Sequence, residues 1–292
     1  MGNFEIPSSA RAIKVLSLSE SARKAEALAK FDVAIQESDL RYLSGNGLRD
    51  AAHRAVNCMG WVWRQWLMGV PTRDLSSRVE RFVDRGLELR ARSTSYHLMA
   101  LHDLYLLHCA LVASGAPQLR RVAEQIADAS GDNGQRPVDN GELYAAAWCG
   151  MVKYWILGDD KKAVEQSELI WRAYREPGVF AAPKPLVSPW LKRDWPAFTK
   201  QQQKDFAKLW NRARKDGWTV KAENATEIVV TTERYQIEHM WCWAHCGMAM
   251  LAHRESVKVI TDQFWFPAAA LENDVLQTQR KSHDDTDQLR MF

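Results

Sequence analysis

The chain has 292 residues, of which 46% are hydrophobic and 26% charged, the mixture of an ordinary globular protein. Its 39 basic and 36 acidic residues give a net charge of +3. This balance argues against a nucleic-acid-binding domain, which concentrates Lys and Arg on one face. No stretch approaches the roughly 18 apolar residues of a membrane span. We therefore expect neither nucleic acid nor a membrane among the partners.

The N-terminus and the cysteines predict a cytoplasmic protein. The opening MGNFEIPSSARAIKVL has no apolar core of signal-peptide length. Five cysteines, an odd number, without a secretion signal favour reduced thiols. Cys58, Cys109 and Cys149 stand among apolar residues of predicted helices, where a buried and unreactive thiol is expected.

Helical periodicity dominates the first 176 residues. Apolar residues recur at spacings of three and four, and helices are predicted over 19–38, 48–68, 75–93, 96–114, 118–129, 142–157 and 161–175. The turn formers SGDNGQRPVDNG at 130–141 predict the clearest loop of the chain. Residues 1–176 are thus expected to form an N-terminal helical region.

The second region, 177–292, begins at a cluster of prolines. Residues 177–196 hold five of the ten prolines and predict an extended or irregular connection. A helix is expected over 199–216, a β-hairpin over the Val-, Ile- and Thr-rich 218–235, and a buried helix over 237–252. The predicted fold is all-α, a bundle of eight or nine helices with a small late hairpin, and the two regions are expected to pack as one compact unit.

Potential metal ligands gather in the last predicted helix. They are His239, Cys242, His245, Cys246 and His253. Zinc accepts such N and S ligands, but ligands on a single helix approach from one side and cannot surround a tetrahedral ion. We expect no metal and no cofactor. A cysteine nucleophile would need a base and an oxyanion site, and no known catalytic motif accompanies these residues. We expect no enzyme; an enzyme using this cluster, or a helical scaffold or adaptor, is the alternative.

Tryptophan is the unusual residue of the composition, with 13 copies. Trp241 and Trp243 stand two positions apart, so on a helix they point about 200° away from each other. We expect one to face the main core and the other to face a closing segment around Trp265 and Pro267. These four residues are the predicted structural core of the C-terminal region.

The segment WCWAHCGMAML (241–251), followed by ITDQFWFPAAAL (260–271), resembles the closing region of helical immunity proteins of bacterial polymorphic toxins. It is most similar to the PoNi-type family, which neutralises DNase toxins of type VI secretion. The residues that carry the resemblance are Trp241, Trp243, Ala249, Leu251, Asp262, Trp265, Phe266 and Pro267, and WRQWLMGVPTRDL (63–75) resembles the family's early helix. The family usually has an acidic residue where this chain has His245, and paired tyrosines where it has Trp265 and Phe266. Another all-helical immunity family therefore stays open.

The resemblance implies a protein that binds a cognate toxin protein and neutralises it by occluding its active site. A nuclease is one candidate target, and its basic groove would require acids on the inhibitor. The acids expected to be exposed are Asp132, Asp139 and Glu142 around the long loop, and Asp159 and Asp160 at a tight turn. Ordinary N-caps and solvated loop acids are the alternative interpretation of these residues. The sequence leaves a homo-oligomer open.

Overall fold

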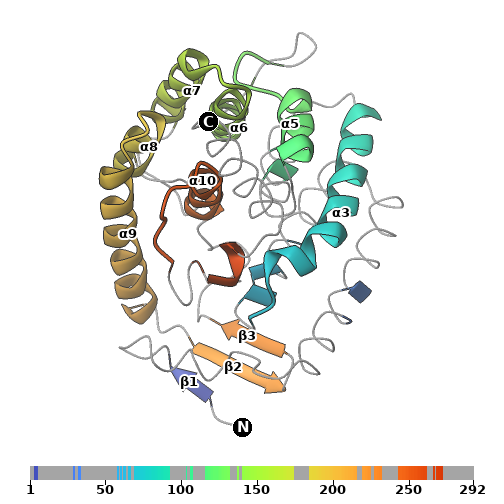
Figure 1. Ribbon diagram of the computed structural model, residues 1–292, viewed down its shortest axis with the longest axis vertical. Coiled ribbons are helices and arrows are strands. Elements are labelled where there is room, and N and C mark those ends of the chain that lie inside the picture. Colours follow the sequence, from blue (N-terminus) through green and yellow to red (C-terminus); the bar gives the residue numbers. More distant parts are fainter. Residues whose placement is uncertain are drawn as a thin grey trace, which may run out of the picture.

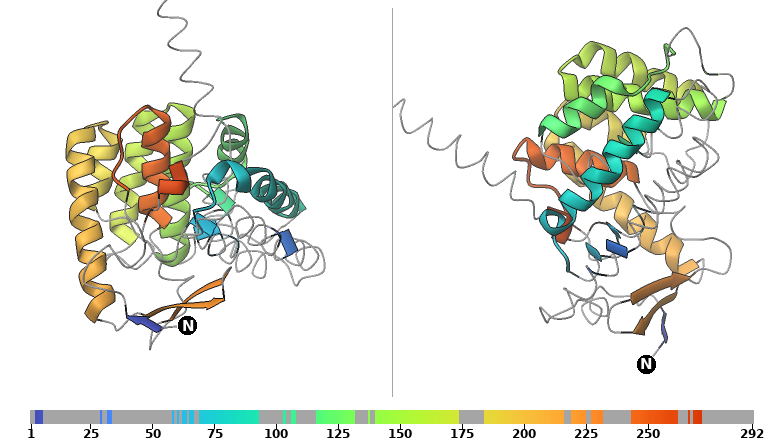
Figure 2. Two further views of the ribbon diagram at one scale, coloured as in Figure 1. Left: turned by 60° about the horizontal axis from the view of Figure 1, so that its bottom comes forward. Right: turned by 90° about the vertical axis from the view of Figure 1, so that its right-hand side faces the viewer.

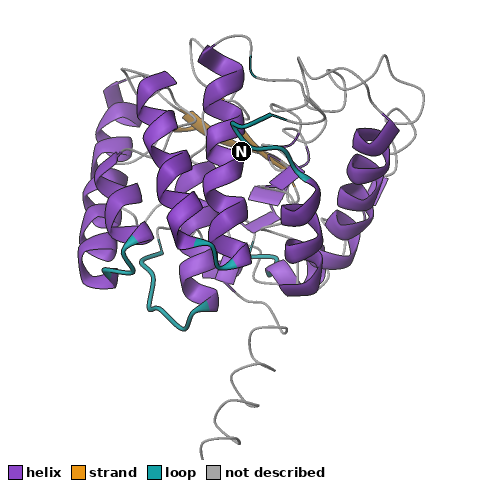
Figure 3. Cartoon of the chain, turned by 90° about the horizontal axis from the view of Figure 1, so that it is seen from above, coloured by secondary structure: helices purple, strands orange, loops and turns teal. Residues whose placement is uncertain are grey.

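The protein is described by a computed structural model over residues 3–5, 29, 32–33, 58, 60, 62–63, 65–66, 69–92, 103, 106–107, 116–131, 137, 140–173, 184–215, 219–224, 227–231, 243–261, 266 and 268–271. These residues are predominantly α-helical, which confirms the predicted helical class (Figure 3). Their α-helices are α3 (Thr72–Arg92), α5 (Ala116–Gln125), α6 (Asn140–Leu157), α7 (Asp160–Ala173), α8 (Lys184–Leu191), α9 (Trp195–Lys215) and α10 (Trp243–Arg254). Most of the predicted helices 19–38, 48–68 and 96–114 lies outside the described residues, so the total of eight or nine stays a prediction.

The helices are arranged around α10. In Figure 1, α8 and α9 lie on one side of α10 and α3 and α5 on the other, and the left view of Figure 2 shows the same order. The short 3-10 helix η3 (Ala268–Leu271) contacts both α10 and α3. The C-terminal segment thus joins helices from both predicted regions.

Three short strands lie at the end of the molecule opposite α5, α6 and α7 (Figure 1). β2 (Thr219–Asn224) and β3 (Glu227–Thr231) pair antiparallel, with Val220 opposite Val230. They fall within 218–235, where the sequence predicts a hairpin. β1 (Asn3–Glu5) pairs antiparallel with the other edge of β2, with Phe4 opposite Val220. β1 was not predicted from the sequence, because three residues are too few to show an alternating pattern.

The buried hydrophobic side chains form one core that draws on both predicted regions. Its largest fully buried members are Trp63, Trp66, Trp148, Trp190, Phe82, Phe198 and Phe266. Trp155 of α6 stacks on Trp190 of α8, with ring centroids 4.6 Å apart. Among the described residues, no helix combines the length and the apolar character needed to cross a bilayer.

The pair α6 and α7 shows how closely the helices pack. α6 is apolar nearly all round, which is typical of a helix buried on most sides. A Cβ added at Gly150 of α6 would come within 2.5 Å of Gln166 Oε1 on α7. Glycine at 150 therefore allows the two helices to approach.

The proline-rich connection differs from its prediction. Residues 184–191 of the predicted irregular segment form α8, and α9 begins at Trp195 rather than at 199. Pro185 and Pro196 stand in the first turns of these helices, where a missing N–H costs little. The side chain of Asp194 caps α9, since its Oδ1 accepts a 3.1 Å hydrogen bond from Ala197 N. Proline content alone therefore gave the wrong prediction here.

Candidate binding site

A hollow on the molecular surface lies between α8 and α9. Its cavity volume is about 470 Å³. α8 and the turn after it contribute Pro185, Ser188, Pro189 and Lys192, and α9 contributes Ala197, Lys200, Gln201 and Lys204, with Asp194 at the corner. Within each helix these positions recur at spacings of three and four, so each set forms one face. We call this hollow the lysine groove.

The opposite faces of the two helices hold them in place. Leu186, Val187 and Trp190 of α8 are buried, as are Phe198 and Phe206 of α9. Gln202 of α9 is also buried, and its Oε1 accepts a 3.2 Å hydrogen bond from Ile260 N. Both walls of the lysine groove are thus fixed to the core.

The charge of the lysine groove is mainly positive. Lys192, Lys200 and Lys204 are exposed, and in the described part of the chain no carboxylate lies within ion-pairing distance of any of them. Asp194 is the one acid among the residues that line the groove. Its capping bond directs its charge to the N-terminus of α9.

A second set of contacts fixes the corner between α8 and α9. The guanidinium of Arg193 donates to Asp160 Oδ2 at 2.8 Å, lies 3.6 Å from Glu255 Oε2 and stands 5.6 Å from the ring centroid of Trp155. The hydrogen bond with Asp160 raises the pKa of Arg193 above its usual value. Arg193 thereby links α6, α7 and the turn after α10 next to the lysine groove.

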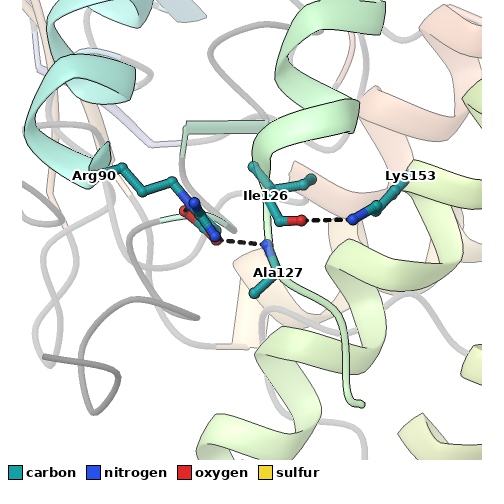
Figure 4. Close-up of polar contacts among 5 residues, drawn as sticks. Arg90, Ile126, Ala127 and Lys153 are labelled. Carbon is teal, nitrogen blue, oxygen red and sulfur yellow. Dashed lines mark hydrogen bonds and ion pairs between the residues drawn. The ribbon is translucent and has the colours of Figure 1, made fainter. Parts of the chain in front are cut away.

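The interior holds a polar cluster at the end of α5 (Figure 4). Arg90 Nε donates to both carboxylate oxygens of the fully buried Asp103, at 2.8 and 3.0 Å. Asp103 also accepts a 2.8 Å hydrogen bond from Ala127 N, and Lys153 Nζ donates to Ile126 O at 2.8 Å. These bonds satisfy backbone groups just after α5 and tie α3 and α6 to them.

Cys149 lies near this cluster but is unsuited to nucleophilic catalysis. Burial, followed by the charge of Asp103, raises the pKa of its thiol well above the usual value. A reactive cysteine needs a lowered pKa and access to substrate. Cys149 and Cys58 are free and buried, which confirms their predicted burial, while Cys109 lies outside the described residues.

A neighbouring carboxylate, that of Asp128, stabilises the turn after α5. Asp128 accepts a hydrogen bond from the hydroxyl of Tyr154, and its Oδ1 accepts a 2.7 Å bond from Ser130 N. Burial and the hydrogen bond to Asp128 raise the pKa of Tyr154. The carboxylates of Asp103 and Asp128 thus hold neighbouring helices together, and both are buried.

The acids predicted to contact a toxin differ in their exposure and their contacts. Glu142 was expected to be exposed, and this expectation is wrong: only 7% of its surface is accessible. Glu142 stands in the first turn of α6, and α6 is covered on most sides. Its negative charge suits a helix N-terminus. Asp132 and Asp139 lie outside the described residues.

The other two acids have roles in the fold. Asp159 caps α7, where its Oδ1 accepts a 3.1 Å hydrogen bond from Lys162 N. Asp160 binds Arg193. Asp159 is half-buried and Asp160 is exposed, so a partner could still reach them. Their contacts match the alternative interpretation of caps and solvated acids.

The predicted His and Cys cluster is described only in part. Cys246 is 3% exposed and His253 is half-buried on α10. His239 and Cys242 lie outside the described residues, and so do Trp241, Trp265 and Pro267. Trp243 begins α10, and its side chain is not described. Among the described residues, no three His, Cys, Asp or Glu side chains are grouped as a metal ion would require.

The lysine groove was not predicted from the sequence. Lys192 lies in the predicted irregular connection, whereas Lys200 and Lys204 lie in the predicted helix 199–216, and no local charge cluster marks them. A helical wheel of 184–192 and 195–215 would have placed these residues on two faces. Searches with this chain found no matching family model, no matching curated protein and no matching solved structure.

Proposed function

We propose that this protein is an immunity protein that binds a cognate toxin and occludes the toxin's active site. The observation that carries the proposal is the resemblance of 241–271 and 63–75 to helical immunity proteins of polymorphic toxins. The resemblance implies a helical protein, and the described residues are predominantly helical. The predicted fold, a bundle of eight or nine helices with a late hairpin, is part of the same proposal.

Within 241–271, the segment that resembles immunity proteins, described residues lie in the hydrophobic core. Ala249 and Leu251 of α10 and Phe266 are buried, at 0%, 2% and 0% exposure. In this proposal the segment builds the scaffold, and the toxin contacts surfaces formed on it. The lysine groove is a surface hollow suited to receive part of the toxin, because both of its walls are anchored to the core.

Co-expression with the toxin encoded by the neighbouring gene tests the proposal. We expect this protein to restore growth, and the purified pair to form a complex in which the toxin is inactive. An unrelated toxin of the same chemical activity serves as the control and should not be blocked. Failure of the protein to bind or to protect against the neighbouring toxin would refute the immunity function.

The acids of the loop at 130–141 allow a second test. A triple change of Asp132, Asp139 and Glu142 to lysine would place a cation at the buried position 142 and unfold the start of α6. The double change Asp132→Lys and Asp139→Lys avoids this effect. Slower association with the toxin, with a weaker salt dependence, is the expected result if the loop contributes rim charge. Unchanged association would remove the loop from the interface.

A further inference from the structure

The chemistry of the lysine groove defines the kind of partner that it fits. Three ammonium groups, those of Lys192, Lys200 and Lys204, surround a hollow of about 470 Å³. Lys200 and Lys204 are one helical turn apart on α9, and Lys192 lies in the turn just after α8. Three cations around one hollow attract an anionic chain that enters it.

The residues that line the lysine groove favour a peptide over a nucleic acid as its ligand. Pro185 and Pro189 supply apolar surface, and Ser188 and Gln201 supply polar groups. The residues that line the groove include no aromatic side chain on which a base could stack. The net charge of +3 also falls short of the broad basic face that a phosphate backbone requires.

We propose that the lysine groove binds an acidic segment of a partner protein, whose Asp or Glu side chains pair with Lys192, Lys200 and Lys204. This inference rests on the proposed function in one respect: it takes the partner to be the toxin. It assigns the toxin an acidic contact segment, where a nuclease groove would have required acids on the inhibitor.

The first experiment measures peptide binding to the lysine groove in the absence of the toxin. The probe is a fluorescently labelled peptide rich in glutamate, and binding to the full-length protein is followed by anisotropy at low and at physiological salt. The groove variant carries Lys192→Glu, Lys200→Glu and Lys204→Glu. The control variant carries Arg73→Glu, Arg81→Glu and Arg92→Glu, three exposed positions on α3, which lies across α10 from the groove (Figure 1).

The two variants change the net charge equally, so only a local effect distinguishes them. We expect the groove variant to lose about tenfold or more in affinity at low salt and the control variant to lose much less. Salt should weaken binding of the wild type more than binding of the groove variant. Equal losses in the two variants would overturn the proposal, and so would tighter binding of a single-stranded oligonucleotide than of the peptide.

The second experiment repeats the comparison with the toxin. If the wild type protects cells and the groove variant associates more slowly while the control does not, the acidic segment belongs to the toxin. If the wild type and the groove variant bind the toxin equally, the inference is wrong and the immunity function stands. If the wild type does not bind the toxin, the immunity function fails, and the peptide result alone decides whether the groove takes an acidic segment. Circular dichroism confirms that both variants remain folded.

Discussion

At the scale of single residues, three of the described helices end with the same pair of backbone hydrogen bonds. In α10, Val257 N donates to Ala252 O at 3.2 Å and Ser256 N donates to His253 O at 3.0 Å. The corresponding bonds close α6 at Gly158 and α8 at Arg193. The residue in the left-handed conformation has φ of 82° at Gly158, 54° at Arg193 and 62° at Ser256. This geometry favours glycine, yet two of the three positions carry a Cβ.

Replacing Ser256 by glycine should stabilise the protein. Glycine removes the steric cost of the left-handed conformation, which outweighs its larger entropy in the unfolded chain. We expect a gain of about 0.5–1 kcal/mol in the free energy of unfolding, measured by urea denaturation. Ser256→Ala keeps the Cβ and should give no gain, and an equal effect of the two changes would contradict the argument. Arg193→Gly should gain less than Ser256→Gly, because it also removes the contacts of the guanidinium.

The buried thiol of Cys149 gives a second prediction at this scale. Its raised pKa disfavours the thiolate, and the folded protein also excludes reagents. We expect maleimide to leave Cys149 unmodified in the native protein, with no acceleration between pH 7 and pH 9, where an exposed thiol becomes ionised. Mass spectrometry of the labelled peptides reads the result, and labelling in urea is the control. Rapid native labelling would show that α6 opens or that the thiol is activated.

At the scale of elements, Thr72 joins the start of α3 to the end of the chain's described part. Its hydroxyl accepts a 3.0 Å hydrogen bond from Trp66 Nε1 and donates a 2.8 Å bond to Ala270 O in η3. All of these groups are buried, so water cannot replace either of the two hydrogen bonds. Residues almost 200 positions apart thus share one polar contact within the core.

Thr72→Val tests this junction with almost no change in side-chain volume. The variant loses the acceptor for Trp66 Nε1 and the donor to Ala270 O, and buried groups that lose partners are costly. We expect a loss of about 2–3 kcal/mol in thermal or urea unfolding. Thr72→Ser keeps the hydroxyl and should lose much less. If both variants lose the same free energy, the methyl group and not the hydrogen bonds is the stabilising part.

At the scale of the whole molecule, the helices are joined by a few buried polar contacts within a continuous apolar core. The ion pair of Arg90 and Asp103 and its bond to Ala127 N connect α3 with the end of α5 (Figure 4). At the other side, the exposed Arg193 connects α6, α7 and the turn after α10. The buried pair specifies one packing arrangement, because a different arrangement would leave its charges buried without partners.

Asp103→Asn should destabilise the whole molecule. The change leaves the Arg90 guanidinium, whose side chain is 12% exposed, facing a neutral group. Breaking a buried pair from one side costs about 3–5 kcal/mol. In a double-mutant cycle with Arg90→Met, the second change should cost much less in the Asp103→Asn background than in the wild type. Additive losses would show that the two residues stabilise the protein independently.

Most of the described helices could be predicted from the sequence, because helical periodicity and capping residues are local properties of the chain. The pattern of 142–157 predicted α6, and that of 161–175 predicted α7, each to within two residues of the observed bounds. α8 could not be predicted from proline content. Pro185 stands in its first turn, where proline permits a helix, and burial of Leu186, Val187 and Trp190 stabilises the helix although it also contains Pro189.

The candidate site could be identified only from the tertiary structure. By itself the sequence determined a helical protein with a tryptophan-rich core, because residue spacing fixes which faces are apolar. Only the tertiary structure decided that Glu142 is buried, since the burial of α6 depends on the elements that pack against it, among them α5 and α7. It also decided that Lys192, Lys200 and Lys204 face one hollow, because the turn at Arg193 and Asp194 sets α8 against α9. Burial and juxtaposition depend on contacts between distant residues, and no local pattern contains them.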